Sequence, residues 1–333
     1  MSKESEIGLS IRRAELSEAQ MIIDFVNSHF DMRLEMINDP EYFNYYYVGD
    51  DGLQFVVAEV NGEYKAVCGY IKANRSGKHI WASVLAADDS YKGAGLQLLS
   101  AMKDVTGASM IAANNIRKKT AVLYTFLGWH AGRISHFYRP ADKASYSLLN
   151  LNGNSQIPPV DSGGILKKID DIRETDALAF IPSGCVPSKD AWYIKRRYFG
   201  FPKGKYDVYM LVDDKSPCAI LVFRIIPASD TGSVPVLRLV DYIGDEKYLP
   251  SAGAEIQRLM DESDAEYVDC YCAGISPEIM KKTGFCERTE GDGTIVPNYL
   301  SPPLIENTEY YYYTSEPEGF VLFKADGDQD RPR

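Results

Sequence analysis

Apolar and polar positions alternate with two different periods in the first part of the chain. Residues 7–16 alternate as a strand does, whereas apolar residues recur at helical spacing from Ile22 to Val26, after a polar start at which Ser17 can cap a helix. Residues 53–60 and 64–74 are strand-like runs on either side of Asn61-Gly62, a strong hairpin signal. This pattern predicts a strand, a helix and then a hairpin. The polar, aromatic residues 42–52 before the hairpin are predicted as loop.

A third strand is predicted over residues 79–87, and the period then changes to that of a helix. Leu98, Leu99 and Met102 share one face of this helix, which Gly107 ends. A strand, a helix and a strand are predicted to follow at residues 109–115, 117–128 and 129–140. The first half therefore reads as a mixed α/β unit in which an antiparallel portion leads into a βαβ portion.

The second half repeats this order after a Gly/Ser/Pro-rich segment at residues 150–164. We predict a helix over 166–179, strands over 205–214, 218–226 and 234–244, a helix over 251–264, a strand over 266–274 and a helix over 276–285. The predicted fold class is α/β with a mixed (α+β) sheet, in two similar domains at residues 1–150 and 151–333. The acidic residues 324–333 are predicted to form a solvated tail.

Composition narrows the functional classes. A length of 333 residues suits two domains, and the 45% apolar and 25% charged content is that of a globular protein. No apolar run approaches the ~20 residues of a membrane span, and the N-terminus lacks the apolar core of a secretory signal, so a cytoplasmic protein that binds no membrane is expected. A net charge of −11 argues against nucleic acid as a partner. With four histidines and six scattered cysteines, interpreted as reduced core thiols, no metal site is expected.

The most informative segment is the turn that follows the third predicted strand. A loop containing glycines leads directly into a helix, whose first amides have no partner within the helix and carry partial positive charge. Such a turn can hold a pyrophosphate, although a Gly-x-Gly sequence alone also suits an ordinary tight turn. The candidate anion-binding residues are Ser90, Tyr91, Lys92, Gly93, Ala94 and Gly95.

This loop and a second motif resemble the GNAT superfamily of N-acyltransferases. The glycines of Ser90–Gly95 match the pattern Gln/Arg-x-x-Gly-x-Gly/Ala that wraps the CoA pyrophosphate in the family, while Ser90 departs from its first position. Asn114-Asn115 followed by Ala121-Val122-Leu123-Tyr124 and Gly128-Trp129 resembles the Asn and the Ala-x-x-Tyr-x-x-x-Gly-Phe helix of the family. The resemblance covers residues 8–140.

The resemblance implies an acyl-CoA co-substrate, acetyl-CoA or a hydroxyacyl-CoA, whose thioester a neutral amine attacks. Tyr124 would protonate the departing thiolate, and Asn115 would belong to the CoA site. The end of the third strand, at Ser83, Val84 and Leu85, would offer backbone groups to the pantetheine and the thioester carbonyl. Asp88, Asp89 and Asp241 are candidate bases, and an amine that arrives neutral would need none.

The second half lacks these motifs. Its corresponding loop, residues 241–250, has no Gly-x-Gly and carries three acidic residues, so we do not expect it to bind CoA. It would bind the acceptor or serve as a structural or dimerising domain. The segments around residues 237–244, 296–303 and 323–332 resemble two-domain GNAT-like proteins of surface-polysaccharide synthesis, of the anthrose-pathway class. This resemblance implies a nucleotide-linked (dTDP) 4-amino-4,6-dideoxy sugar bound between the domains. Asp241 would bind a sugar hydroxyl or the amine and Arg238 a phosphate, or either residue would form a structural ion pair.

Three alternatives remain open. A Fem-like aminoacyl transferase is disfavoured by the acidic balance and the intact glycine loop, and a protein-lysine acetyltransferase would require a peptide cleft. A non-catalytic CoA-binding protein would retain the loop without releasing thiol. The tyrosine-rich runs at 42–47 and 310–313 are interpreted mainly as packing, with a binding role left open for Tyr45, Tyr46 and Tyr47. Oligomeric state stays undetermined.

Overall fold

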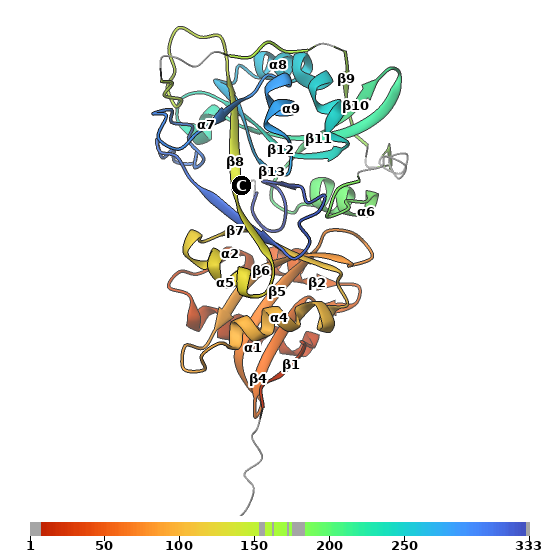
Figure 1. The fold of residues 1–333 in the computed structure, drawn as a ribbon, viewed down its shortest axis with the longest axis vertical. Coiled ribbons are helices and arrows are strands. Elements are labelled where there is room, and N and C mark those ends of the chain that lie inside the picture. The colour runs from red at the N-terminus through yellow and green to blue at the C-terminus, as the bar shows by residue number, and fades with distance from the viewer. Residues whose placement is uncertain (1–7, 153–156, 162, 172, 175–183, 331–333) are drawn as a thin grey trace, which may run out of the picture.

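The computed structural model describes residues 8–152, 157–161, 163–171, 173–174 and 184–330. Figure 1 shows two lobes stacked along the long axis, with the N-terminal half of the chain below and most of the C-terminal half above. In the described parts of the chain, no helix has both the length and the apolar character needed to cross a membrane. One mixed sheet runs through both lobes in the order β1-β4-β5-β6-β7-β15-β8-β13-β12-β11-β10-β9, with β14 beside β8 and β16 beside β13.

The N-terminal half contains the predicted elements in the predicted order. Its strands are β1 (Ser10–Arg13), β2 (Val48–Gly49), β3 (Gly52–Leu53), β4 (Phe55–Val60), β5 (Glu63–Lys72), β6 (His79–Ala87), β7 (Met110–Ile116) and β8 (His130–Pro140). Its helices are η1 (Leu16–Glu18), α1 (Ala19–His29), α2 (Glu35–Asn38), α3 (Pro40–Tyr47), α4 (Ala94–Thr106), η2 (Lys118–Thr120) and α5 (Ala121–Phe126). The hairpin turn is confirmed, since Asn61 and Gly62 both have positive φ and join antiparallel β4 and β5.

The sheet of this half is covered on both faces. Helices α1, α2 and α3 pack with Val57, Val67 and Trp81 on one face, which we call the α1–α3 face. Helices α4 and α5 pack with Val56 and Cys68 on the opposite face, which we call the α4–α5 face. The side to which each strand residue points therefore decides which helices it meets.

The second half repeats the arrangement, as predicted. Its strands are β9 (Ile165–Lys168), β10 (Asp207–Asp213), β11 (Ser216–Ile226), β12 (Val236–Gly244), β13 (Tyr267–Ala273), β14 (Cys286–Arg288), β15 (Tyr310–Thr314) and β16 (Leu322–Phe323). Its helices are α6 (Ala191–Ile194), the π-helical turn η4 (Lys195–Phe199), α7 (Ala228–Thr231), η5 (Glu246–Ala252), α8 (Gly253–Glu262) and α9 (Pro277–Lys282). In each half, a parallel pair joins the strand before the long helix to the strand after it, β6 with β7 and β12 with β13.

Three predictions were wrong. Part of the predicted loop at 42–52 is helix α3, because Asp39 accepts hydrogen bonds from the first-turn amides and Pro40 suits the first helical position. The start of the predicted helix at 166–179 is strand β9, paired with β10, while residues 172 and 175–179 lie outside the described residues. The predicted solvated tail is buried as far as Asp330, which is 1% exposed; residues 331–333 lie outside the described residues.

The two lobes exchange strands. The C-terminal strand β15 lies between β7 and β8 of the N-terminal lobe. In return β8, yellow in Figure 1, pairs with β15 over its first half and with β13 of the upper lobe over its second half. Each lobe is therefore completed by a strand from the other half of the chain.

Aromatic residues of α3 pack against the other lobe. The Tyr45 hydroxyl donates to the backbone oxygen of Arg196 (3.0 Å), and the guanidinium of Arg196 lies 4.5 Å from the Tyr45 ring centroid. The rings of Tyr42 and Tyr46 contact Phe201. The tyrosine run at 42–47 thus packs between the lobes, in agreement with the interpretation as packing.

Candidate functional site

A β-bulge lies at the point of β6 where the sequence places the thioester. Ala82 pairs with Tyr70 and Leu85 pairs with Cys68, so Ser83 and Val84 together oppose the single residue Gly69. Parallel pairing between β6 and β7 ends at Trp81, directly before the bulge. A bulge leaves strand groups without ladder partners and re-aims the side chains. The two strands therefore separate from Ser83 onward, and the backbone of Ser83, Val84 and Leu85 borders the opening.

The loop after β6 is the predicted anion-binding segment, and it leads directly into α4. Asp88 orders the loop by accepting from the amide of Ser90 through Oδ1 (2.8 Å) and from the amide of Tyr91 through its backbone oxygen (3.0 Å). Gly93 has φ +85°, a left-handed conformation at the N-cap of α4 that favours glycine. A Cβ on Gly95 would lie 3.4 Å from that of Ala87, so this glycine lets α4 lie close to β6.

The side chains of this loop leave the helix end open. Ser90 and Lys92 are exposed, Tyr91 is half-buried, and Ala94 is buried beneath the helix. The amide of Ala94 donates to the backbone oxygen of Tyr91 (3.3 Å), and the amides that follow it in the first turn of α4 have no acceptor within the helix. Backbone amides, with Lys92 nearby, can therefore bind a phosphate group.

Tyr124 lies on α5, on the α4–α5 face of the sheet. Its ring is 4.1 Å from the ring of Tyr313 on β15 and belongs to the same apolar cluster as Leu85 and Cys68. Burial raises the pKa of Tyr124, so the phenol keeps its proton at neutral pH and can donate it. Tyr124 thus lies on the same face of the sheet as Leu85, the residue after the bulge, which suits the predicted role as an acid.

The opposite face of the bulge carries a chain of hydroxyls that ends at a carboxylate. The Ser83 hydroxyl donates to Oδ2 of Asp328 (2.7 Å). Its oxygen lies 2.8 Å from the hydroxyl of Tyr47, which must be the donor because the serine proton is already used. Asp328 was not identified from the sequence, and Tyr47 was named only with a binding role left open, since each lies far from β6 along the chain. Strand alternation would place Ser83 on the same face as Leu85, and only the bulge turns it to the opposite face.

Asn115 lies at the end of β7 and contacts the C-terminal segment. It has φ +62°, is exposed, and donates to Oε1 of Gln329 (2.9 Å). Its neighbour Asn114 donates to the backbone oxygens of Phe323 (3.2 Å), Lys324 (3.5 Å) and Asp326 (3.2 Å). The predicted CoA contact of Asn115 stays a prediction, and the structure adds a role for this asparagine pair in holding the C-terminal segment.

Asp241 lies in the second half, at the equivalent bulge. It is fully buried, pairs with the ammonium of Lys189 (2.6 Å) and accepts from the Tyr198 hydroxyl. Lys189 also pairs with Asp326 (2.9 Å). Burial and the neighbouring Asp326 raise the pKa of Asp241 to about 6 in spite of Lys189. The partners of Asp241 are thus the chain's own groups, and its predicted role toward the amine stays a prediction.

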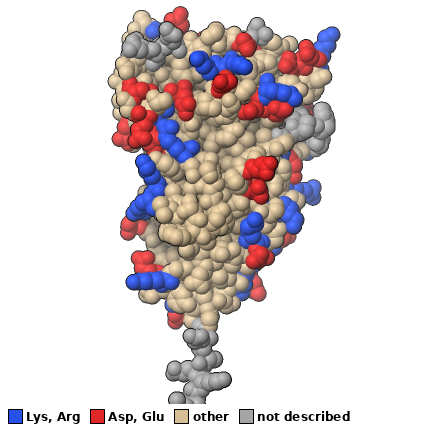
Figure 2. Space-filling model, viewed as in Figure 1, with Lys and Arg blue, Asp and Glu red and all other residues tan. Residues whose placement is uncertain are grey.

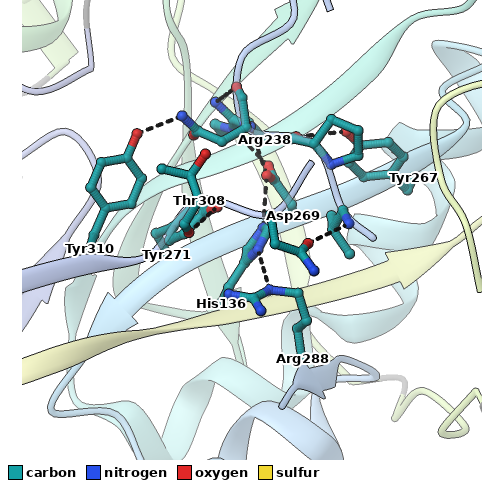
Figure 3. Close-up of polar contacts among 12 residues, drawn as sticks. His136, Arg238, Tyr267, Asp269, Tyr271, Arg288, Thr308 and Tyr310 are labelled. Atoms are coloured by element: carbon teal, nitrogen blue, oxygen red, sulfur yellow. Dashed lines mark hydrogen bonds and ion pairs between the residues drawn. The ribbon is translucent and has the colours of Figure 1, made fainter. Parts of the chain in front are cut away.

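Arg238 belongs to a buried network where β8 joins the upper lobe, shown in Figure 3. Its guanidinium donates twice to Asp269 at 2.7 Å. Asp269 also contacts Nε2 of His136 (3.2 Å), and Nε of Arg288 donates to Nδ1 of the same ring (3.3 Å). Arg238 is 1% exposed, so its ion pair serves the junction between β8 and β13.

Besides Asp241, two further carboxylates were candidate bases. Asp88 orders the loop after β6, and Asp89 is exposed.

The equivalent opening of the second half is closed by the chain itself. Parallel pairing of β12 with β13 ends at Leu239, but β16 then pairs with Cys272 and Ala273 of β13. The amide of Ala325 donates to the oxygen of Val240 at the bulge (2.9 Å). The backbone groups that remain open along β6 are thus occupied along β12. The expectation that the second half does not bind CoA stays a prediction.

Metal chemistry finds no support in the described residues. No group of three or more His, Cys, Asp or Glu side chains in these parts of the chain could hold a metal ion. Cys270 and Cys272 are buried with free thiols in the core of the upper lobe.

Comparisons with known proteins show the fold. No protein-family model and no curated protein matches the sequence. Among solved structures, a GCN5-related N-acetyltransferase from Anabaena variabilis ATCC 29413 has a TM-score of 0.55 at 12% identity, covering 92% of this chain and 72% of that chain. A conserved Enterococcus faecalis V583 protein of unknown function, provisionally assigned as an N-acyltransferase, has a TM-score of 0.53 at 10% identity with the same coverage. The likeness extends over both halves, which confirms the predicted fold class of two tandem GNAT-like domains.

Proposed function

We propose that the N-terminal lobe transfers an acyl group from acyl-CoA to a primary amine. The carrying observation is that the β6 bulge, the glycine loop before α4 and Tyr124 meet around Leu85: Gly95 packs against Ala87 and Leu85, and Tyr124 belongs to the same apolar cluster as Leu85. An N-acyltransferase needs these three parts: a site for the pyrophosphate, backbone groups along the pantetheine and thioester, and an acid for the thiolate. The fold shared with the Anabaena variabilis N-acetyltransferase supports the same proposal.

Each part has a defined task in this reaction. The amides of Gly93 and Gly95 bind the pyrophosphate, and Ser90, Tyr91, Lys92 and Ala94 flank it. The backbone of Val84 and Leu85 binds the pantetheine. Acyl-CoA, bound there, supplies an activated thioester. Tyr124 is protonated at neutral pH and donates its proton as the thiolate leaves. The reference pKa of a thiol is about 1.5 below that of a phenol, so this proton transfer is uphill by itself and is driven by the breaking of the C–S bond.

The surface next to the glycine loop suits the remainder of this co-substrate. Val122, Leu123 and Phe126 of α5 are 62%, 48% and 78% exposed. Figure 2 shows that the middle of this face of the N-terminal lobe, over α4 and α5, is almost free of charged side chains. An apolar surface beside an anion-binding loop fits a pantetheine or acyl chain that extends from the phosphates.

For the acceptor we propose a nucleotide-linked amino sugar of the dTDP-4-amino-4,6-dideoxy class. A cavity of about 950 Å³ lies among α1, α2 and α3, on the same face of the sheet as Ser83. Its lining combines the carboxylates of Asp24 and Asp31, the amides of Asn27 and Asn38, and apolar groups such as Phe30. Carboxylates and amides suit an amine and sugar hydroxyls, and an aromatic ring suits the face of a sugar. This chemistry supports an amino-sugar acceptor.

The test is thiol release from acetyl-CoA and from hydroxybutyryl-CoA with a panel of dTDP-, UDP- and GDP-linked amino sugars. We expect release that depends on one nucleotide sugar. Release with peptidyl lysine or simple amines alone would keep the transferase and overturn the sugar. Binding of CoA without thiol release from any acceptor would overturn the transferase in favour of a CoA-binding protein.

A further inference from the structure

The C-terminal segment, residues 322–330, passes between the lobes and is fixed by both. From the N-terminal lobe, Asn114 binds three of its backbone oxygens, as described above. From the upper lobe, Lys189 pairs with Asp326, and Arg197 donates to the oxygens of Ala325 (3.0 Å) and Asp330 (2.5 Å). A segment held at so many points has one position relative to β6.

Asp328 is the point at which this segment opens toward the β6 bulge. Asp326, Gly327 and Asp330 are buried, and Gly327 lies against the Trp81 side chain, where an added Cβ would be 3.4 Å away. Asp328 itself is half-buried. Its Oδ2 accepts from Ser83 (2.7 Å) and its Oδ1 accepts from Gln329 (2.5 Å). An ionised carboxylate has about four acceptor positions, so further sites remain for a substrate proton.

The two faces of the sheet give this carboxylate a distinct place. Tyr124 packs on the α4–α5 face of β6, whereas the bulge turns Ser83 to the α1–α3 face, where it meets Asp328 and Tyr47. Acid and carboxylate are thus on opposite sides of the opening in the sheet. A thioester lying in that opening would meet Tyr124 on its sulfur side and an incoming amine on the side of Asp328.

We propose that Asp328, supplied by the C-terminal segment, is the catalytic base that takes the proton from the acceptor amine in the N-terminal lobe. This rests on the proposed acyl transfer. The amine nitrogen forms a bond to the acyl carbon, and the carbonyl π electrons move to oxygen. One amine proton passes to Oδ2 of Asp328, with the Ser83–Tyr47 hydroxyls holding the carboxylate in place. The C–S bond then breaks, and the thiolate takes the proton of Tyr124, which leaves an amide and free CoA. Solvent then takes the proton from Asp328 and returns one to Tyr124.

The proposal assigns the second half a part in catalysis without a cofactor of its own. Closure of its groove by β16 and Ala325 positions the residues that follow, so the same segment that blocks one opening brings a carboxylate to the other. Through Asp328, the second half contributes a catalytic group to the N-terminal lobe in addition to packing against it.

The test compares Asp328→Asn with wild type in thiol release from acetyl-CoA, using the most active amine of the panel. Asparagine keeps the size of the side chain and an acceptor for Ser83 but binds the amine proton poorly. We expect kcat to fall about 10²-fold with CoA affinity and the melting temperature unchanged. Asp104→Asn, a matched change on the exposed side of α4, is the control and should keep the wild-type rate. In Asp328→Ala, added formate should restore part of kcat, which no structural role would explain.

The outcomes separate this inference from the proposed function. An active wild type together with an unchanged kcat in Asp328→Asn would overturn the role of Asp328 and leave the transferase intact. A lower kcat with no formate rescue of Asp328→Ala would equally overturn it, in favour of a structural contact. A wild type that releases no thiol with any amine would overturn both.

Discussion

At the scale of single residues, a substitution of Tyr124 is the most direct test of the proposed acyl transfer. Replacing it with phenylalanine keeps the ring against Tyr313 and removes only the hydroxyl proton. We expect kcat to fall by about 10²-fold while acyl-CoA affinity stays the same, since the proton moves only as the thiolate leaves. Tyr209→Phe, a half-buried tyrosine on β10 of the other lobe, is the matched control. An unchanged single-turnover rate in Tyr124→Phe would remove this residue from the mechanism.

His136 carries a second residue-scale prediction, on stability. Burial lowers its pKa to about 4, and because Arg288 donates to Nδ1, the ring is neutral with its proton on Nε2, facing Asp269. An unfolded histidine titrates near 6.5, so between pH 6.5 and 4 the unfolded chain binds the extra proton and stability falls as pH falls, by up to about 1.4 kcal/mol per pH unit. Above pH 6.5 this contribution is fully present.

Urea unfolding from pH 7 to pH 4.5 checks this prediction. His136→Gln retains hydrogen bonding without a titrating ring, so its free energy of unfolding should fall less steeply with decreasing pH, whatever its value at pH 7. His29→Gln, on the exposed end of α1, should retain the wild-type slope. Parallel slopes for wild type and His136→Gln would contradict the assignment of a neutral, buried ring.

The sequence predicts those candidate site residues whose positions depend only on spacing along the chain. The glycines of the loop before α4 and Tyr124 can be read from the chain because strand, loop and helix follow one another directly. Tyr47 and Asp328 could not, since they meet Ser83 only after the sheet has formed, from 36 and 245 residues away. The acidic composition of the chain end also argued against a role for Asp328, because such a segment is normally exposed to solvent. Here Lys189 and Arg197 bind the segment that carries Asp328.

At the scale of elements, the N-terminus of α4 and the closed groove of the second half together predict CoA binding at one site per chain. Gly93→Asp should abolish binding, because it places a carboxylate beside the pyrophosphate and a side chain at φ +85°. Gly107→Asp is the matched control: it adds the same side chain at φ +72°, at the other end of the same helix, where a Cβ would meet nothing within 4 Å. Titration calorimetry with CoA measures affinity and stoichiometry. Two sites per chain, or unchanged affinity in Gly93→Asp, would contradict the assignment.

Elements were predicted well where periodicity was clear and poorly where local chemistry overrode it. Strand β6 occupies the predicted residues 79–87, and Gly107 ends α4 as expected. Helix α3 was missed because its tyrosines look like a loop or strand, although Asp39-Pro40 before them is a recognisable helix start. Strand β9 was missed because its four residues are too short to show a period, and it forms by pairing with β10.

At the scale of the whole molecule, the exchange of β8 and β15 means that the two halves should not fold separately. Residues 1–150 alone would lack β15, whose Tyr310, Tyr313 and Thr314 are at most 5% exposed, and would leave the facing edges of β7 and β8 unpaired. Residues 151–333 alone would lack β8 and leave the edge of β13 that faces β8 unpaired. Such edges favour aggregation. We expect each fragment expressed alone to be insoluble or to lack a cooperative unfolding transition, and co-expression to restore a soluble complex with CoA binding. Cooperative unfolding of residues 1–150 alone would show that the N-terminal lobe is stable without β15, and the segment that positions Asp328 would then be an addition to an independent domain rather than part of its core.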